Sequence, residues 1–268
     1  MLLDAHNHLH DARLAPWRGD ILRDLDAANV QGAMVNGTRE DDWAQVAALA
    51  SDLPWVKPSF GLHPWYVSSR TPQWRGTLLS FLDAHPGCGI GEIGLDRWIE
   101  GYDFPAQFEC FTWQLEIAAE RNLPATIHCL RAWGALWDLV REHSVPHRGF
   151  LLHAYGGPAE MVDGFVARGA YFSFSPYFLH ARKGAQRDVF RNLPTDRLLV
   201  ETDAPDLAPP PERNTHLLPD HEGKALNHPA NLTVAYEGLA EIRGWTMEEL
   251  TARIAENYTR LFGKRPMV

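Results

Sequence analysis

Two histidines near the N-terminus, His6 and His8, are separated by one residue and lie at the end of a short apolar run. Side chains at positions i and i+2 of a β-strand point to the same side, so both imidazoles could bind one metal ion. A pair of this kind also occurs as two ordinary polar loop residues. The pattern therefore gains its meaning from the residues that end the other apolar runs.

Four further apolar runs end in a histidine or carboxylate residue, in segments that read Gly-Glu-Ile-Gly-Leu-Asp, Thr-Ile-His, Leu-Leu-His and Glu-Thr-Asp. The carboxyl ends of parallel barrel strands converge on one face, where such barrels carry their active sites. Together with the first pair, these residues could give each of two ions three or four ligands if one carboxylate bridges them. The sequence therefore predicts a metal centre formed by His6, His8, Glu92, His128, His153 and Asp203.

The predicted donor set contains imidazoles and carboxylates and no thiolate. Such a set suits Zn, Mn, Fe, Ni or Mg. The four histidines favour zinc or another transition metal, since magnesium sites rich in carboxylates usually lack histidine. Two ions of this kind can activate water near neutral pH and stabilise negative charge on a substrate, so the residues predict a hydrolase.

Eight short apolar runs, rich in β-branched residues, are expected to form the strands that position these side chains. Amphipathic segments separate them, and this alternation implies a parallel sheet with right-handed crossovers. Eight such units in 268 residues predict a single (β/α)₈ TIM-barrel domain over residues 1–268, with an open doubly wound α/β sheet as the alternative. The runs are Leu2–His6, Gln31–Asn36, Val56–Gly61, Gly89–Gly94, Ala125–His128, Gly149–His153, Ala170–Ser175 and Leu198–Thr202.

The clearest helical pattern covers Gln107–Arg121, where apolar residues recur every three or four positions and form one face. Shorter patterns cover Gly134–His143 and Glu160–Arg168. Thr246–Glu249 is a capping-box pattern that predicts the start of a last helix ending at Gly263. Ala208–Asn227 is the longest irregular segment, and because it follows the eighth strand we expect it beside the active face.

The composition limits the partners and the compartment. A net charge of −9 argues against a stable duplex-binding face, although two bound cations would make the site itself locally positive. No apolar run approaches the ~20 residues of a membrane span, and the N-terminus lacks signal-peptide features. Three cysteines, Cys88, Cys110 and Cys129, without CxxC spacing argue against disulfides or a thiolate zinc site. We therefore expect a cytoplasmic monomer or weak oligomer.

In combination, these segments resemble the TatD family of metal-dependent hydrolases, a group of amidohydrolase-like TIM barrels. The resemblance runs from residue 1 to about residue 263. It implies a phosphodiesterase or deoxyribonuclease that acts, in the manner of a 3′-5′ exonuclease, on DNA or nucleotide ends. The matching segments are Asp4–Leu9, Gly61–Pro64, Gly91–Asp96, Ile127–His128, His153–Tyr155, Ser173–Ser175, Leu199–Pro205, Asn227–Pro229 and Asn257–Phe262.

The resemblance also implies a role for each predicted ligand. His6 and His8 would bind one metal ion, and His128 and His153 would bind the second. Glu92 would bridge the two ions.

Two further residues receive roles in catalysis from the same resemblance. Asp203 would be a ligand that also orients the attacking water and accepts its proton as a general base. His63 would contact the scissile phosphate, although it could also be a loop histidine stacked beside Pro64. Glu201 lies two residues before Asp203 and would either orient a ligand histidine or pair with a cation in the barrel.

The chain departs from the usual family pattern at several positions outside the predicted ligands. Leu130 stands where an arginine is common, and Arg131 follows one residue later. Trp98 lies where the family often has an aromatic pair, while Tyr155 and His228 replace other common residues. We expect all of these positions to lie where substrate is recognised, and we predict Arg131 and Trp98 as substrate contacts together with His63.

These departures and the acidic charge leave a second function open, an amidohydrolase or esterase that acts on a small molecule. A third possibility is a non-catalytic metal-binding or partner-binding protein on the same fold. Exposed aromatic residues would favour a nucleic acid, because they stack on bases. Trp65 and Trp98 lie on loops and could either stack or pack, whereas Trp133 is expected to pack between the barrel and a helix.

Overall fold

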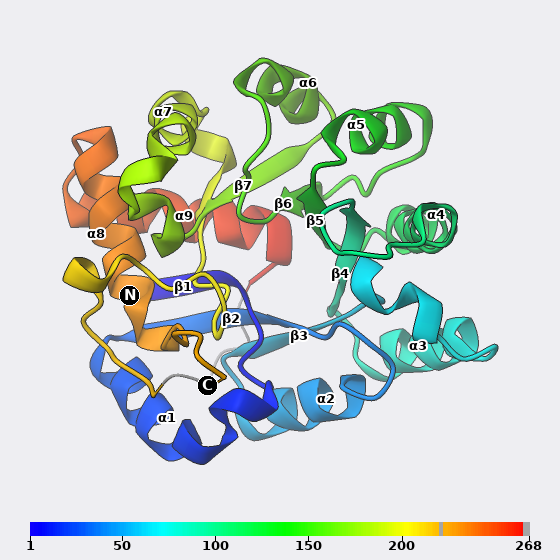
Figure 1. Ribbon diagram of the computed structural model, residues 1–268, viewed down its shortest axis with the longest axis horizontal. Coiled ribbons are helices and arrows are strands. Elements are labelled where there is room, and N and C mark those ends of the chain that lie inside the picture. The colour runs from blue at the N-terminus through cyan, green and yellow to red at the C-terminus, as the bar shows by residue number, and fades with distance from the viewer. Residues whose placement is uncertain (220–221, 265–268) are drawn as a thin grey trace.

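The computed structural model describes residues 1–219 and 222–264. Eight parallel strands follow one another in chain order, and the helices surround them (Figure 1). The strands are β1 (Leu2–Asn7), β2 (Val30–Asn36), β3 (Val56–Phe60), β4 (Gly89–Asp96), β5 (Ala125–Leu130), β6 (Phe150–Leu152), β7 (Ala170–Phe174) and β8 (Leu198–Val200). Each overlaps a run expected from the sequence.

Backbone hydrogen bonds join the first strand to the segment that follows the last one. The amide of Asp203 donates to the carbonyl of His6 at 3.0 Å, and the amide of His8 donates to the carbonyl of Ala204 at 2.8 Å. The side chain of Asp4 adds a bond to the amide of Thr202 at 3.1 Å. These bonds close the ring of strands, so the barrel is confirmed and the open sheet is wrong.

The helices agree with the sequence patterns, with shifts at their ends. The predicted helix at 107–121 begins earlier because Asp103 accepts a hydrogen bond from the amide of Ala106 and Pro105 occupies the first turn. The capping box of Thr246 and Glu249 is confirmed. The helices are α1 (Arg18–Ala27), α2 (Trp43–Asp52), α3 (Trp74–Ala84), α4 (Phe104–Arg121), α5 (Trp133–Glu142), α6 (Val162–Ala167), α7 (Gly184–Asn192), α8 (Leu232–Arg243) and α9 (Met247–Phe262).

Helix α4 contributes two buried glutamines that fix the backbone at the ends of two neighbouring strands. The side chain of Gln107 accepts from the amide of Asp96 and donates to its carbonyl, both at 2.8 Å. Gln114, seven residues further along the same helix, binds the amide and the carbonyl of Leu62 at 2.7 and 3.2 Å. The segments that follow β3 and β4 are therefore held by one helix.

Two glycines allow the strands to approach each other where the polar side chains converge. A Cβ on Gly61 would lie 2.7 Å from the backbone carbon of Gly91, which immediately precedes Glu92. Gly94 has a φ of +153°, and a Cβ there would lie 1.9 Å from the carbonyl oxygen of His128. Any larger residue at Gly94 would separate β4 from β5 at this point.

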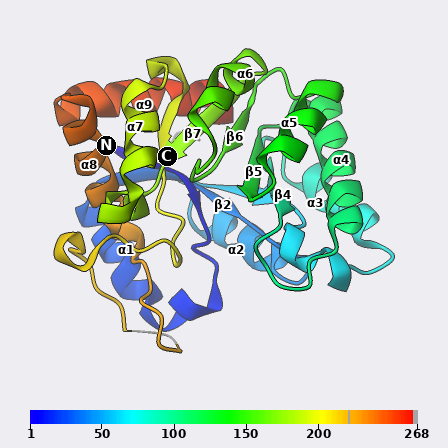
Figure 2. The ribbon, with the colours of Figure 1, turned by 45° about the horizontal axis from the view of Figure 1, so that its top comes forward.

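The segment after β8 is largely irregular, as expected, and folds back along the end of the barrel (Figure 2). The side chain of Asn227 donates to the carbonyl of Thr202 at 2.8 Å, and that of Asn231 donates to the carbonyl of His216 at 3.1 Å. Residues 220–221 of the expected segment lie outside the described residues. Among the described residues, none of the helices combines the length and the apolar character needed to cross a bilayer.

Candidate metal centre

The carboxylate of Glu92, in β4, lies at the middle of a cluster of imidazoles. Its Oε2 is 3.2 Å from Nε2 of His8 and 3.5 Å from Nε2 of His6. Its Oε1 is 2.9 Å from Nε2 of His153 and 3.2 Å from Nδ1 of His128. The residue is only 2% exposed. The two oxygens of one buried carboxylate thus face two different pairs of histidines.

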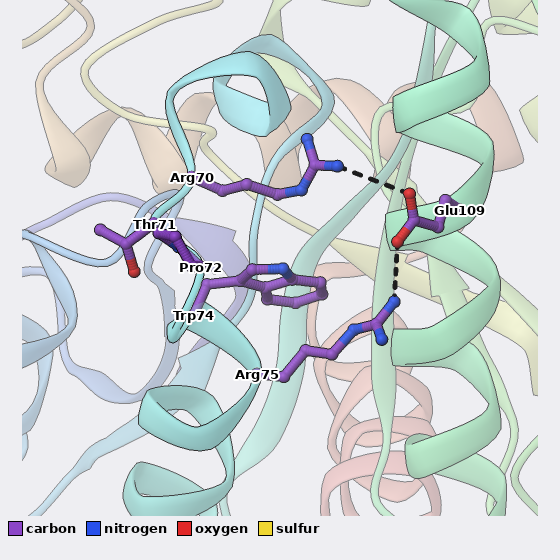
Figure 3. A pocket seen from close by; sticks show the side chains of 6 residues that line it. All are labelled: Arg70, Thr71, Pro72, Trp74, Arg75 and Glu109. Carbon is purple, nitrogen blue, oxygen red and sulfur yellow. Dashed lines mark hydrogen bonds and ion pairs between the residues drawn. The ribbon is translucent and has the colours of Figure 1, made fainter.

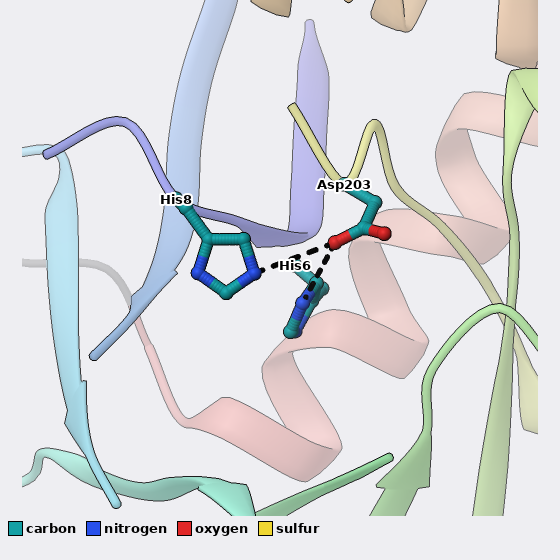
Figure 4. A group of neighbouring side chains, drawn as sticks. All are labelled: His6, His8 and Asp203. Carbon is teal, nitrogen blue, oxygen red and sulfur yellow. Dashed lines mark ion pairs between the residues drawn. The ribbon is translucent and has the colours of Figure 1, made fainter. Parts of the chain in front are cut away.

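The first pair shares a second carboxylate. Nε2 of His6 and Nε2 of His8 lie 3.1 and 3.5 Å from Oδ1 of Asp203, and Figure 4 shows both rings directed at that oxygen. Asp203 has a φ of +55°, in the left-handed region, and its amide is bonded to the carbonyl of His6. This turn directs a side chain from the end of β8 back toward β1. The donor atoms of the three residues lie within 4.8 Å of one another, close enough to hold one ion.

The second pair is accompanied by His63. Its Nε2 lies 3.3 Å from Oε1 of Glu92, and the donor atoms of His63, Glu92 and His128 form another group within 4.8 Å. The sequence placed His63 at the substrate, whereas the structure places it against the central carboxylate as well. His6, Glu92 and His153 form a third such group. The six predicted ligands are therefore brought together, with His63 beside them.

Four side-chain or backbone groups contact ring nitrogens of the predicted ligand histidines and orient their imidazoles. Nδ1 of His8 lies 2.8 Å from the carbonyl of Asn36, and Nδ1 of His6 lies 2.9 Å from the side-chain amide of the same residue. Nε2 of His128 lies 2.8 Å from Oδ2 of Asp96. Nδ1 of His153 lies 3.6 Å from Oε1 of Glu201, whose other oxygen accepts a bond from Ser173.

These contacts favour the interpretation of Glu201 as a residue that orients a histidine. They also identify two residues that the sequence interpretation missed. Asn36 ends β2, and Asp96 ends the Gly-Leu-Asp segment of β4. Both occupy the same strand-end position as the predicted ligands, which is the signal that could have found them.

Several buried polar atoms in this cluster have no hydrogen-bond partner among the described residues. They include Nε2 of His6, Nδ1 of His153, Oδ1 of Asn36 and Oε1 of Glu201. Such atoms are rare in folded proteins because each costs free energy. A cation on Nε2 of His6 would give that atom a partner and leave the proton on Nδ1. Because the Asn36 amide can turn over in the same volume, its Oδ1 could then accept a hydrogen bond from this Nδ1–H group. The residues fit a bound metal.

Burial and neighbouring charges act against each other in this cluster. Burial raises the pKa of Glu92, but the surrounding imidazoles of His63, His153 and His6 outweigh it and hold the pKa well below its usual value. Burial lowers the pKa of His8 and of His153, but the nearby carboxylates outweigh it and raise both well above 6.5. Burial lowers the pKa of His63 to about 4. Without an ion, the carboxylate of Glu92 is therefore ionised, and His8 and His153 hold protons.

Of the predicted substrate contacts, His63 lies within the cluster, whereas Trp98 and Arg131 lie outside it. Trp98, in the segment after β4, is 55% exposed, and Arg131, directly after β5, is also exposed. Leu130 beside it is exposed as well, and Trp65, after β3, is 41% exposed. We call Trp65, Trp98, Leu130 and Arg131 the rim.

Two of the departures from the family pattern do not face this rim, so that expectation was wrong for them. Tyr155 is fully buried, and its ring packs edge-on against Trp133 with centroids 4.6 Å apart, because the barrel and α5 enclose it. The same contact agrees with the expected packing role of Trp133. His228 is 3% exposed and accepts from the amide of Ala230, since it caps a short 3₁₀ turn.

A surface hollow of about 360 Å³ lies apart from these residues, between the start of α3 and the side of α4 (Figure 3). Arg75 and Arg70 lie 2.8 and 3.5 Å from the carboxylate of Glu109, which spans them. The charge of the two guanidinium groups is thereby partly neutralised. The lining contains none of the imidazoles or carboxylates of the metal centre.

A (β/α)₈ barrel that gathers histidines and carboxylates at the carboxyl ends of its strands is the arrangement of a metal-dependent hydrolase. The family model described as "TatD related DNase" matches residues 3–263. The chain belongs to the TatD family and is a metal-dependent hydrolase.

Relatives of known sequence and structure extend along nearly the whole chain. It is 30% identical over 264 residues to the "3'-5' ssDNA/RNA exonuclease TatD" of Escherichia fergusonii, covering 98% of this chain and 99% of that protein. It is 28% identical over 262 residues to "Uncharacterized metal-dependent hydrolase YabD" of Bacillus subtilis, covering 98% and 99%. The crystal structure of YJJV, a TatD homolog from Escherichia coli K12, superposes with a TM-score of 0.89 at 26% identity, covering 98% of both chains.

Proposed function

We propose that this chain is a phosphodiesterase that removes nucleotides from the 3′ ends of single-stranded DNA or RNA. The observation that carries the proposal is the position of Glu92, whose two oxygens face two separate pairs of histidines. A carboxylate in that position can bridge two cations, which is the arrangement used to cleave phosphodiesters. The substrate is suggested by relatives that are named 3′-5′ ssDNA/RNA exonucleases.

We propose that two divalent cations occupy this centre. Zinc, or Mn, Fe or Ni, suits the four imidazoles better than Mg does. When bound, the pair would activate water near neutral pH and stabilise negative charge on the phosphate. The first cation would be held by His6, His8 and Asp203, the second by His128 and His153, and Glu92 would lie between them.

Asp203 is suited to accept the proton of the attacking water. Burial raises its pKa, but the neighbouring imidazoles, His6 first, outweigh it and hold the pKa far below its usual value. The carboxylate is therefore ionised at neutral pH and can act as a general base. It is also more exposed than Glu92, 8% against 2%, so water reaches it more readily.

His63 is suited to contact the substrate phosphate. Because its pKa lies at about 4, the ring is neutral at pH 7 and can donate one hydrogen bond without carrying a charge. Around the centre, Trp65 and Trp98 expose ring surface on which bases can stack, and Arg131 offers a cation to the backbone. A single-stranded end can reach a centre enclosed by these loops, whereas the net charge of −9 disfavours a stable duplex-binding face.

The decisive experiment uses the metal-loaded protein and a single-stranded oligonucleotide labelled at its 5′ end. We expect a ladder of products that shorten from the 3′ end, no products after removal of metal by a chelator, and recovery on adding zinc or manganese. An oligonucleotide with phosphorothioate linkages at its 3′ end is the control and should resist. Intact substrate under all metal conditions would contradict the proposal.

A second candidate is a hydrolase of a small ester or amide. The observation that favours it is Leu130, an exposed apolar residue on the rim at a position where the family commonly has an arginine. The same preparation, tested on lactones, amides and small phosphodiesters, distinguishes the two. Hydrolysis of a lactone or amide with no cleavage of oligonucleotides would establish the second candidate.

We also propose that residues 1–268 form one domain that acts in the cytoplasm as a monomer or weak oligomer. The three cysteines are buried and unpaired, which suits a reducing compartment. Measurement of the mass in solution would test the oligomeric state.

A further inference from the structure

We propose that Asp96 is a positioning residue that fixes the ring of His128 for metal binding and ties this ring to Trp65 on the rim. The inference rests on the metal centre of the proposed function. It concerns a residue outside the predicted ligands and substrate contacts, which would act through its neighbours.

One oxygen of Asp96 holds both side chains. Oδ2 lies 2.8 Å from Nε2 of His128, and the indole N–H of Trp65 donates to it at 2.8 Å. A carboxylate oxygen accepts hydrogen bonds, so Nε2 of His128 must carry a proton. In the neutral ring Nδ1 then has the free lone pair. This atom lies 3.2 Å from Oε1 of Glu92 and 3.2 Å from Nε2 of His153, where the second cation would be held. The tautomer chosen by Asp96 is therefore the one that a metal ligand needs.

The other oxygen of Asp96 is also occupied. Oδ1 accepts from the backbone amides of Trp98 and Ile99 at 2.5 and 3.2 Å, while Gln107 clamps the backbone of Asp96. Asp96 is fully buried. Because both oxygens and the backbone are held, the carboxylate cannot rotate freely. If His128, Trp65 or the backbone of residues 98–99 moves, the carboxylate of Asp96 is expected to move with it and to shift its other partners.

Trp65 connects Asp96 with the exposed rim of the site. The residue is 41% exposed on the rim, and its ring centroid lies 6.4 Å from that of His128 and 5.1 Å from that of His63. A nucleobase that stacks on Trp65 would therefore rest on the residue that holds Asp96. Phenylalanine at this position would keep an aromatic face but lose the indole N–H. The inference thus assigns to tryptophan a function that stacking alone does not require.

The chain supplies a matched control in Trp98. This tryptophan is also on the rim and more exposed, but its hydrogen bond to Asp96 comes from the backbone amide, so replacement of its ring leaves that bond in place. Trp65→Phe and Trp98→Phe therefore remove the same atoms, and only the first removes a bond to Asp96. Asp96→Asn removes one acceptor, because an amide cannot accept from His128 and Trp65 while also accepting from both backbone amides.

The test compares the full-length wild-type protein with these three variants by zinc titration and by NMR of the histidine rings. Asp96→Asn should weaken one of the two zinc sites about 10- to 100-fold and leave the other unchanged. Trp65→Phe should weaken the same site by a smaller factor, and Trp98→Phe should leave both affinities unchanged. In the metal-free protein, the hydrogen-bonded N–H of the His128 ring should give a downfield proton signal. This signal should vanish in Asp96→Asn, shift in Trp65→Phe and persist in Trp98→Phe.

Equal weakening of both sites in all variants, or wild-type affinities together with an unchanged ring signal in Asp96→Asn, would overturn the inference. If Asp96→Asn fails to fold, as thermal unfolding would show, Trp65→Phe decides, and an unshifted signal with wild-type affinity contradicts the proposal. This test can fail or succeed independently of the test of the proposed nuclease activity. A protein that binds two zinc ions with the expected variant pattern but leaves oligonucleotides intact would refute the nuclease and retain the role of Asp96.

Discussion

The rings of His6 and His153 stack face to face, with centroids 4.0 Å apart and an interplanar angle of 18°. One ring comes from β1 and the other from β6, and they belong to the two different pairs around Glu92. The two halves of the proposed centre are therefore in van der Waals contact. Displacement of either of these two rings is therefore expected to disturb the other.

Zinc binding should become tighter as the pH rises from 6 to 8. The pKa values of His8, His128 and His153 are raised in the metal-free chain, because neighbouring carboxylates outweigh the effect of burial. Raised values mean that these rings hold protons at the lower pH, and zinc must displace them. The affinity should increase about tenfold per pH unit for each proton released. Calorimetry in two buffers of different ionisation enthalpy would measure the release, and an affinity independent of pH would contradict it.

Asp203→Asn should lower kcat for oligonucleotide cleavage by about 10²–10⁴-fold, because the amide cannot accept the proton of the attacking water. The fold should be unaffected, as circular dichroism and thermal unfolding would show. Asp206→Asn, three residues away, is the control. That side chain is exposed and pairs with Arg13 at 2.8 Å, so its loss should leave kcat close to the wild-type value. Similar losses in both variants would argue against a specific role for Asp203.

Glu92→Gln should lower the content of both metal ions, since a neutral amide cannot bridge two cations. Elemental analysis of protein purified without added metal would give the ratio of ions to chain. Glu109→Gln removes an exposed carboxylate from the outer side of α4 and should retain the wild-type ratio. A variant at position 92 that still holds two ions would show that the bridge is not needed for binding.

Gly94→Ala should destabilise the fold by about 3 kcal/mol or more, because the new Cβ would meet the carbonyl oxygen of His128 and the backbone cannot yield. Gly76→Ala is the matched change, in helix α3, where a Cβ meets nothing within 4 Å among the described atoms. That variant should gain up to about 1 kcal/mol from the better helix propensity of alanine. Chemical denaturation of both proteins would measure the difference. A Gly94→Ala protein as stable as wild type would show that β4 and β5 can separate without cost.

His228 should make the fold sensitive to acid. Burial lowers the pKa of this ring to about 4, against an ordinary value near 6.5 in the unfolded chain. Between these two values the unfolded chain binds the proton and the folded chain does not, so stability falls as the pH drops from 6.5 to 4. The loss amounts to about 3 kcal/mol at most.

In His228→Asn this part of the pH dependence should disappear, while the asparagine can still cap the turn at Ala230. Denaturation of both proteins at pH 7 and pH 4 would provide the comparison. Equal losses of stability in the two proteins would assign the acid sensitivity to other groups.

The sequence predicted the barrel well because the strands are largely buried and therefore apolar, and each predicted ligand lies in a strand or within three residues of its end. His6, Glu92, His128 and Asp203 could be placed on one face without any knowledge of contacts. The orienting groups were harder to predict, because their function depends on direction. Asp96 is one more carboxylate in a polar segment until its distance to His128 is known, and Gln107 and Gln114 look like ordinary helix residues. Tyr155 and His228 were misplaced because a sequence position after a strand does not reveal whether the side chain turns inward.

Because the barrel closes between its first and last strands, the order of synthesis limits when the protein can bind its metal ions. The pair of His6 and His8 lies on the seam between the first strand and the last, and Asp203 reaches it only through the bonds that join the two. A ribosome makes the N-terminal histidines first, yet 203 of the 268 residues must be made before the carboxylate that completes their group exists. Contacts so distant in sequence form late in folding. Metal loading is therefore expected to follow translation, and a nascent chain stalled before residue 203 should retain zinc far more weakly than the released protein.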